Sequence, residues 1–177
     1  MRQLEIREAT SNDFSELMLF YHMMCEVLDG KEFLPNGNRG GFPSGEMVSE
    51  AISRHGQFLG IEDGKIIAAY ILNHHCDPAY HCARWQVNAK PDAVMILHAL
   101  RVSPQYGGRG YAKRLVEHAI ATAKERNQKA IRLDVLEGNT IPERMYAAYG
   151  FQYVDTVEIC YEDIGEYMRF RLMELAL

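Results

Sequence analysis

The feature that most constrains the fold is a run of glycines between an apolar segment and an amphipathic one. Residues 93–102 are strongly apolar and predict a buried strand. Gly107, Gly108 and Gly110 follow and indicate a tight turn. Apolar residues then recur at helical spacing, namely Ala112, Leu115, Val116, Ala119, Ile120 and Ala123. The sequence therefore predicts a strand, a glycine-rich turn and a long amphipathic helix in this order.

Such a turn favours a ligand that carries a di- or triphosphate. The first N–H groups of a helix have no partner within it, the helix dipole makes them electropositive, and glycines let a ligand approach the backbone. Arg109 adds a full positive charge. A P-loop is disfavoured because no Lys-Ser or Lys-Thr pair follows, and Gly108-Arg109-Gly110 lacks the third glycine of a dinucleotide fingerprint. A turn that only connects strand to helix stays open as an alternative at this point.

The remaining patterns predict one domain, residues 1–177, of the mixed α/β class. Asp63-Gly64 between two apolar runs is a strong hairpin signal. Thr140-Ile141-Pro142-Glu143 has the capping-box pattern with Thr140 as the cap, and Gly150 suits the end of that helix. Residues 29–45 are rich in glycine and proline and predict a long loop. The expected strands are 4–7, 57–62, 65–72, 93–102, 131–135, 153–161 and 167–172, and the expected helices end near 28, 54, 126 and 149.

Composition and charge narrow the class of protein. The chain has 177 residues, which suits one domain, and a net charge of −5, which argues against a nucleic-acid partner. No apolar run approaches the ~18 residues of a membrane span, and the N-terminus has no apolar signal core. We therefore expect a cytoplasmic protein without a membrane partner. The four cysteines lack CxxC spacing and are expected to be free thiols.

Residues 73–92 gather histidine and cysteine without a regular spacing. His74, His75, Cys76, His81 and Cys82 lie in one irregular stretch, without CxxC or HxxxH. A tetrahedral metal site usually draws on regular spacings, so no metal is expected. A wall of a substrate pocket or a plain loop is the preferred interpretation, and the same holds for Tyr80 and Trp85.

Two motifs resemble the GNAT superfamily of acyl-CoA-dependent N-acyltransferases. The segment Gln105-Tyr106-Gly107-Gly108-Arg109-Gly110 is similar to the family signature Q/R-x-x-G-x-G/A. Downstream, Leu133-Asp134-Val135, Asn139 and the run from Met145 to Phe151 resemble the family pattern L-x-V…N…LYxxxGF. The resemblance covers residues 94–151 strongly and residues 4–72 by the order of elements only.

The resemblance implies a fold, a cosubstrate and a binding site. The fold would be a mixed, mostly antiparallel sheet flanked by helices, and the cosubstrate acetyl-CoA. Leu100 and Val102 would offer backbone groups to its pantetheine arm, and Asn139 would contact that arm or position a water. The family usually has a small residue where this chain has Pro142. The pyrophosphate would lie against Gln105, Tyr106, Gly107, Gly108, Arg109, Gly110, Tyr111 and Ala112.

Acetyl transfer to an amine needs a base and an acid. Tyr146 matches the family tyrosine, and a phenol can protonate a leaving thiolate; a core aromatic is the alternative. His98 is the preferred base, because strand alternation would place it on the same face as Leu100 and Val102, and a histidine is similarly placed in the arylalkylamine branch of the family. A core histidine is the alternative. Asp134, Glu137 and Glu158 are expected to be surface acids.

These expectations combine into an N-acetyltransferase that moves an acetyl group from acetyl-CoA to a primary amine by direct attack in a ternary complex. A small-molecule acceptor is preferred over a protein or peptide, since no groove for a basic peptide is evident. A non-catalytic acyl-CoA-binding sensor or structural module is the rival from another class. Homodimers are the commonest oligomers, and a homodimer is the expected partner state.

Overall fold

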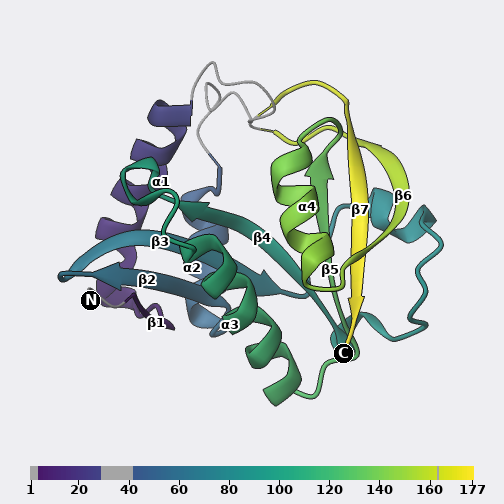
Figure 1. The fold of residues 1–177 in the computed structure, drawn as a ribbon, viewed down its shortest axis with the longest axis horizontal. Helices are drawn as coiled ribbons and strands as arrows, with labels where there is room; N and C mark the ends of the chain where they lie inside the picture. The colour runs from purple at the N-terminus through teal and green to yellow at the C-terminus, as the bar shows by residue number, and fades with distance from the viewer. Residues whose placement is uncertain (1–3, 29–41, 163) are drawn as a thin grey trace.

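The computed structural model describes residues 4–28, 42–162 and 164–177 and folds them around a seven-stranded sheet (Figure 1). The strand order is β1-β2-β3-β4-β5-β7-β6. β4 and β5 are parallel and every other neighbouring pair is antiparallel, so the predicted mixed, mostly antiparallel sheet is confirmed. The strands are β1 Glu5–Glu8, β2 Gln57–Glu62, β3 Lys65–Asn73, β4 Val94–Val102, β5 Ala130–Leu136, β6 Gln152–Ile159 and β7 Met168–Ala176.

Helices cover both faces of the sheet (Figure 1). On one face α3 (Tyr111–Glu125) and α4 (Thr140–Ala148) bury the main core, which includes Leu115, Val116 and Tyr146. On the other face α1 (Phe14–Leu28) and α2 (Gly45–Ser53) pack over β2 and β3. The helical stripe predicted along α3 is buried as expected at all of its positions except Ile120 and Ala112, which are half-buried.

Local sequence signals place the turns. Asp63 and Gly64 have φ of 52° and 74°, the left-handed conformation that the hairpin between β2 and β3 requires. The Ser44 side chain accepts a hydrogen bond from Met47 N–H at 3.1 Å and caps α2. The loop predicted at residues 29–45 lies outside the described residues as far as 41, and its last residues cap and begin α2.

The C-terminal part departs from the sequence prediction in two places. Asn139, not Thr140, is the N-cap of α4, and the Glu143 carboxylate accepts a hydrogen bond from Arg171 at 2.9 Å instead of reaching back to the cap. Pro142 is the third helical residue, where no intrahelical N–H bond is lost. β7 continues to Ala176 because it pairs along all of β5, which the prediction of a strand over 167–172 missed.

Residues 74–93 form a layer over the β5–β7 end of the sheet. They contain two short 3-10 helices, Pro78–Cys82 and Pro91–Ala93. The Glu174 carboxylate of β7, 3% exposed, accepts hydrogen bonds from the Gln86 and Val87 amides and from Arg132 Nε at 2.9 Å. The Arg132 guanidinium stacks on Trp85 at 4.2 Å. This buried ion pair fixes the irregular segment to the sheet.

β4 and β5 diverge, and this splay positions the site. The two strands pair only from Val94 to Ile96, opposite Ala130 to Arg132. Figure 1 shows them starting together at the end of the sheet that holds the C-terminus and separating toward the opposite end. A β-bulge interrupts β4, because the register with β3 shifts between Ala69 and Ile71 and Ala99 adopts a φ of 49°.

Candidate active site

The second half of β4 presents a backbone edge to the splay. Ser103 N–H donates to the Ile67 carbonyl of β3 at 2.8 Å. Backbone groups alternate in direction along a strand, so those of Leu100 and Val102 point away from β3 and toward the gap. An extended ligand can pair with this edge as a further strand would. The arrangement is what the prediction for Leu100 and Val102 requires.

The glycine-rich turn lies at the end of that edge and is open. Gly108 and Gly110 have φ of 74° and 76°, and a methyl group added at either would meet no atom within 4 Å. Gly110 is the N-cap of α3 and brings no side chain to the first amides of the helix, those of Tyr111 and Ala112. Gln105 is exposed. The uncapped amides and the empty space above the glycines suit a phosphate group.

Arg109 is bound to the protein in a way that the sequence does not reveal. Its Nη1 donates to Glu62 Oε1 at 3.0 Å, and its guanidinium stacks on the Tyr106 ring at 5.0 Å. The Glu62 carboxylate is 2% exposed and also accepts a hydrogen bond from the Tyr111 hydroxyl. The full charge expected of Arg109 is therefore partly offset by Glu62 in this structure.

Tyr146 lies on α4 and its side chain is buried. Its ring packs in the main core and meets Phe151 edge-on at 5.5 Å. Gly150, with a φ of 92°, ends the helix and lets the Phe151 N–H donate to the Tyr146 carbonyl at 3.2 Å, so the predicted glycine cap fixes this tyrosine. Among the described residues no hydrogen-bond partner of its hydroxyl is found. Burial raises the pKa of Tyr146 to about 12, which keeps the phenol protonated.

His98 lies on the other face of β4 from the one predicted. The bulge at Ala99 adds a residue, so His98 pairs with Ile71 while Val102 pairs with Ala68, and these partners point to opposite faces. Leu100 and Val102 pack toward α3. His98 faces the α1–α2 side, and the predicted shared face is therefore wrong. An alanine in an apolar run gave no sign of a bulge.

The surroundings of His98 fix its proton. Its Nε2–H donates to the His75 carbonyl at 2.9 Å and to Asn73 Oδ1 at 3.0 Å. Since a carbonyl oxygen only accepts, Nε2 carries the proton and Nδ1 keeps the lone pair. Burial lowers the pKa of His98 to about 4. The imidazole is therefore neutral at pH 7.

Asp134 was expected at the surface and is instead desolvated, on the face of β5 that Tyr80 and Tyr161 cover. The Tyr80 and Tyr161 hydroxyls donate to its Oδ2 at 2.6 and 2.7 Å. Burial raises the pKa of this carboxyl. Glu137 and Glu158 are exposed as expected. A charge in the middle of a strand between two apolar neighbours was the available signal, because both faces of a central strand are covered.

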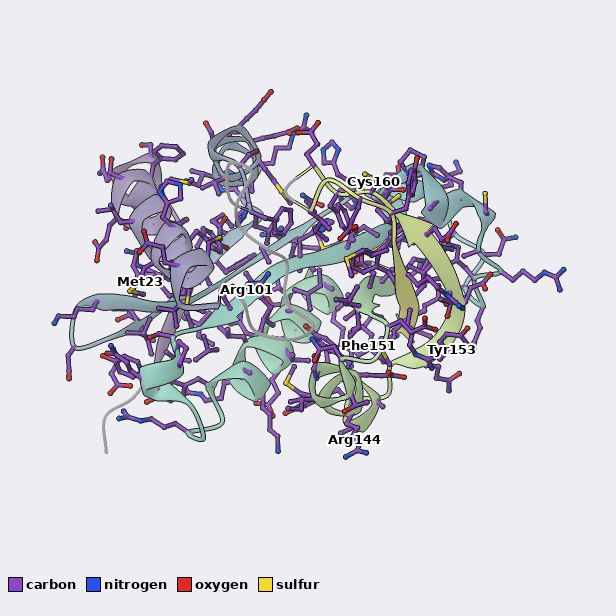
Figure 2. All side chains as sticks on the ribbon, turned by 90° about the horizontal axis from the view of Figure 1, so that it is seen from above. Met23, Arg101, Arg144, Phe151, Tyr153 and Cys160 are labelled. Atoms are coloured by element: carbon purple, nitrogen blue, oxygen red, sulfur yellow. The ribbon has the colours of Figure 1, made fainter. Side chains whose placement is uncertain are left out.

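Arg101 is a second charged group that the sequence analysis did not single out. It is half-buried on β4 and pairs with Ala69, so it shares the face of His98. Figure 2 shows Arg101 near the middle of the view, on β4, and Arg144 on the outer side of α4. The Nη1 of Arg101 donates to the Leu100 carbonyl at 3.0 Å. An arginine within an apolar run was again the only sequence signal.

The histidines and cysteines of the irregular segment serve separate purposes. His74 Nδ1 donates to the Val94 carbonyl at 2.7 Å, and His75 Nε2 lies 3.4 Å from Glu50 Oε1. Across residues 4–28, 42–162 and 164–177 no group of three metal-binding side chains is brought together.

Within the same ranges no helix has the length and apolar character needed to cross a membrane. Asn139 is half-buried at the start of α4, beside the splay.

Comparisons with known proteins place the chain in a family. Solved structures that resemble it include an acetyltransferase of the GNAT family from Streptococcus agalactiae (TM-score 0.77, 20% identity, 98% of this chain and 95% of that one). The yncA protein of Salmonella typhimurium, solved with its cofactor acetyl-CoA, matches with a TM-score of 0.71 and 13% identity over 98% and 94% of the two chains. The ribosomal-protein-alanine N-acetyltransferase of Brucella melitensis matches with a TM-score of 0.71 and 16% identity, over 98% of this chain and 100% of that one.

These identities are low and carry the fold alone. No curated protein matches the sequence. The model of the acetyltransferase (GNAT) family matches residues 25–151, which include the splay, the glycine-rich turn and α4. The chain therefore belongs to the GNAT family of acetyltransferases.

Proposed function

We propose that the chain transfers the acetyl group of acetyl-CoA to the primary amine of a small molecule, by direct attack in a ternary complex. The observation that carries the proposal is the open backbone edge of β4 leading into the uncapped N-terminus of α3. An extended pantetheine arm suits the edge at Leu100 and Val102, and a pyrophosphate suits the amides from Gln105 to Ala112. Asn139, at the start of α4, would contact the arm or hold a water.

The proposed chemistry uses a neutral base and a protonated phenol. The amine nitrogen forms a bond to the thioester carbonyl carbon, and the carbon–sulfur bond breaks. His98 accepts the amine proton at Nδ1, directly or through water, and the Tyr146 hydroxyl gives its proton to the leaving sulfur. With a pKa of about 4 His98 is a weak base, so its part is to remove a proton from an already nucleophilic amine.

Tyr146→Phe tests the acid with a matched control on the same helix. The variant keeps the ring in the core and removes only the hydroxyl, so kcat should fall about 100-fold while acetyl-CoA binding is unchanged. Tyr149→Phe removes a hydroxyl that donates to Glu117 at the surface and should leave kcat unchanged. Equal kcat in wild type and Tyr146→Phe, measured by thiol release, would remove the acid assignment.

The same assay separates the rival functions. A sensor module would bind acetyl-CoA and release no thiol with any amine. A protein or peptide acetyltransferase, like the Brucella protein whose fold this chain shares, would prefer N-terminal peptides over small amines. The homodimer predicted from the sequence stays a prediction, which sedimentation equilibrium would measure.

A further inference from the structure

Arg101 is a half-buried cation without a carboxylate partner among the described residues. Within residues 4–28, 42–162 and 164–177 other arginines pair with carboxylates, but Arg101 belongs to none of these ion pairs. Its one hydrogen bond, from Nη1 to the Leu100 carbonyl, leaves most of its N–H groups free. Guanidinium N–H groups that no protein group uses are suited to bind a planar carboxylate. We therefore expect the anion to come from a ligand.

Asp134 is a carboxylate of which one oxygen has no donor among the described residues, as Arg101 is a cation without a carboxylate partner there. Both tyrosine hydroxyls donate to Oδ2, and no donor among the described residues reaches Oδ1. Keeping this acid away from bulk water is costly, since burial disfavours its charged form. A carboxylate with one oxygen held by two hydroxyls and the other unoccupied is suited to bind a cation such as an ammonium group.

The register places these two charges on one face of the splay. Ile96 of β4 pairs with Arg132 of β5, so residues two positions further along each strand, His98 and Asp134, lie on the same face on the two sides of the splay. After the bulge, Arg101 is the next residue of β4 on that face. Burial is the main cause of the raised pKa of Tyr146, and both charges also act on its hydroxyl, Arg101 lowering this pKa and Asp134 raising it. The cation and the anion therefore share one face of the sheet, and the proposed acid lies near enough for both charges to act on its hydroxyl.

We propose that the acceptor is a free amino acid, whose carboxylate binds Arg101 and whose ammonium group binds Asp134 beside Tyr146. The inference rests on the proposed function and narrows it to acceptors that carry both charges. Arg101 does not serve the coenzyme phosphates, because it faces α1 and α2 while the glycine-rich turn leads into α3 on the opposite face. The bound ammonium group loses one proton to the solvent, and the neutral amine that Asp134 then holds attacks the thioester, after which His98 takes the second proton from the nitrogen.

The test compares each amino acid with its own methyl ester, which keeps the amine and the side chain and removes the carboxylate. The full chain is assayed with saturating acetyl-CoA by thiol release, against the standard amino acids, their methyl esters and an N-terminal peptide amide. We expect kcat/KM for the preferred amino acid to exceed that for its ester by about 100-fold, the loss typical of a charged hydrogen-bonded pair. Equal use of ester or peptide amide would overturn the inference.

Variants of Arg101 and Asp134 test whether these residues cause the preference for an amino acid over its methyl ester. Arg101→Met should lower kcat/KM for the amino acid about 100-fold and leave the value for the ester within about twofold. Arg144→Met, an exposed arginine on α4, is the matched control and should keep the full preference. Asp134→Asn should lower kcat/KM for amino acid and ester alike, since they share the amine. A loss in Arg101→Met that is equal for both acceptors would overturn the role of Arg101.

Binding of acetyl-CoA distinguishes failure of the amino-acid acceptor from failure of the proposed acetyl transfer. Each variant should show the same rise in melting temperature with acetyl-CoA as the wild type, which also shows that it is folded. Release of thiol with amines that lack a carboxylate, unaffected by Arg101→Met, leaves the proposed transfer in place and removes the amino-acid acceptor. No thiol release with any class, from a protein that acetyl-CoA stabilises, contradicts the transfer itself and the inference with it.

Discussion

Single side chains in the splay have properties that favour chemistry over stability. Tyr146 keeps its proton because burial raises its pKa to about 12, and its hydroxyl has no hydrogen-bond partner among the described residues. Asp134 is a desolvated carboxylate, and Arg101 is a cation without a carboxylate partner there. A core built for stability alone would pair these groups or replace them with apolar residues. They therefore mark the site.

Asp134→Asn is predicted to stabilise the protein while it lowers activity. Asparagine keeps an oxygen that accepts the Tyr80 and Tyr161 hydroxyls and removes the charge whose burial is unfavourable. The free energy of unfolding at pH 7 should rise, because burial disfavours the charged form of the carboxyl. Urea unfolding monitored by tryptophan fluorescence measures it. A destabilised variant would indicate that the carboxylate serves the fold.

His98 is predicted to make stability fall in acid. Its pKa is about 4 in the folded protein and near 6.5 when unfolded, so the unfolded chain binds the extra proton between these values. The contribution of the neutral His98 to the free energy of unfolding is complete above pH 6.5. About 3 kcal/mol of it is lost as the pH falls toward 4. His98→Asn should lose less stability than the wild type over this range. His22→Asn, at an exposed site on α1, should behave as the wild type does.

Among the elements, the turn before α3 is where a backbone conformation and a binding site coincide. Gly64 and Gly108 both have a φ of 74° and open space where a methyl group would lie. Gly64→Ala and Gly108→Ala should therefore cost about the same stability, roughly 1 kcal/mol. Only Gly108→Ala should weaken acetyl-CoA binding, about 10-fold or more by calorimetry, because its methyl group occupies the phosphate position. Equal affinities would remove the turn from the site.

The layer of residues 74–93 depends on one buried ion pair. Glu174→Gln removes the charge that holds Arg132 and weakens the bonds to the Gln86 and Val87 amides. Breaking a buried pair from one side should lower the free energy of unfolding by about 3 kcal/mol. Glu137→Gln removes the exposed partner of Arg169 and should change it by less than about 1 kcal/mol. Matching losses in the two variants would contradict the role of Glu174.

Sequence patterns predicted the elements better than they predicted the site. The Asp63-Gly64 hairpin, the stripe along α3 and the Gly150 cap depend on near neighbours and were confirmed. The face of His98 was wrong because the bulge at Ala99 carries no glycine or proline to announce it. The burial of Asp134 was missed because Tyr80 and Tyr161, its partners, lie 54 and 27 residues away in the sequence.

At the scale of the whole molecule, the separation of β4 from β5 organises everything else. It exposes a backbone edge, ends at the uncapped N-terminus of α3, and brings Tyr146 from α4 to the same gap. Neither strand reveals the separation alone, because it depends on where their pairing stops.

The most direct test of the central claim is a thermal shift with acetyl-CoA, coenzyme A, ATP and NAD in parallel. A ligand that binds only the folded state raises its apparent stability by about 2.7 kcal/mol at 100 times its Kd, which corresponds to several degrees in Tm. The account predicts such a shift with acetyl-CoA and coenzyme A and none with the other two. A shift in Tm with ATP or NAD alone would contradict the account, and so would the absence of a shift with all four ligands. The glycine-rich turn would then only connect β4 to α3.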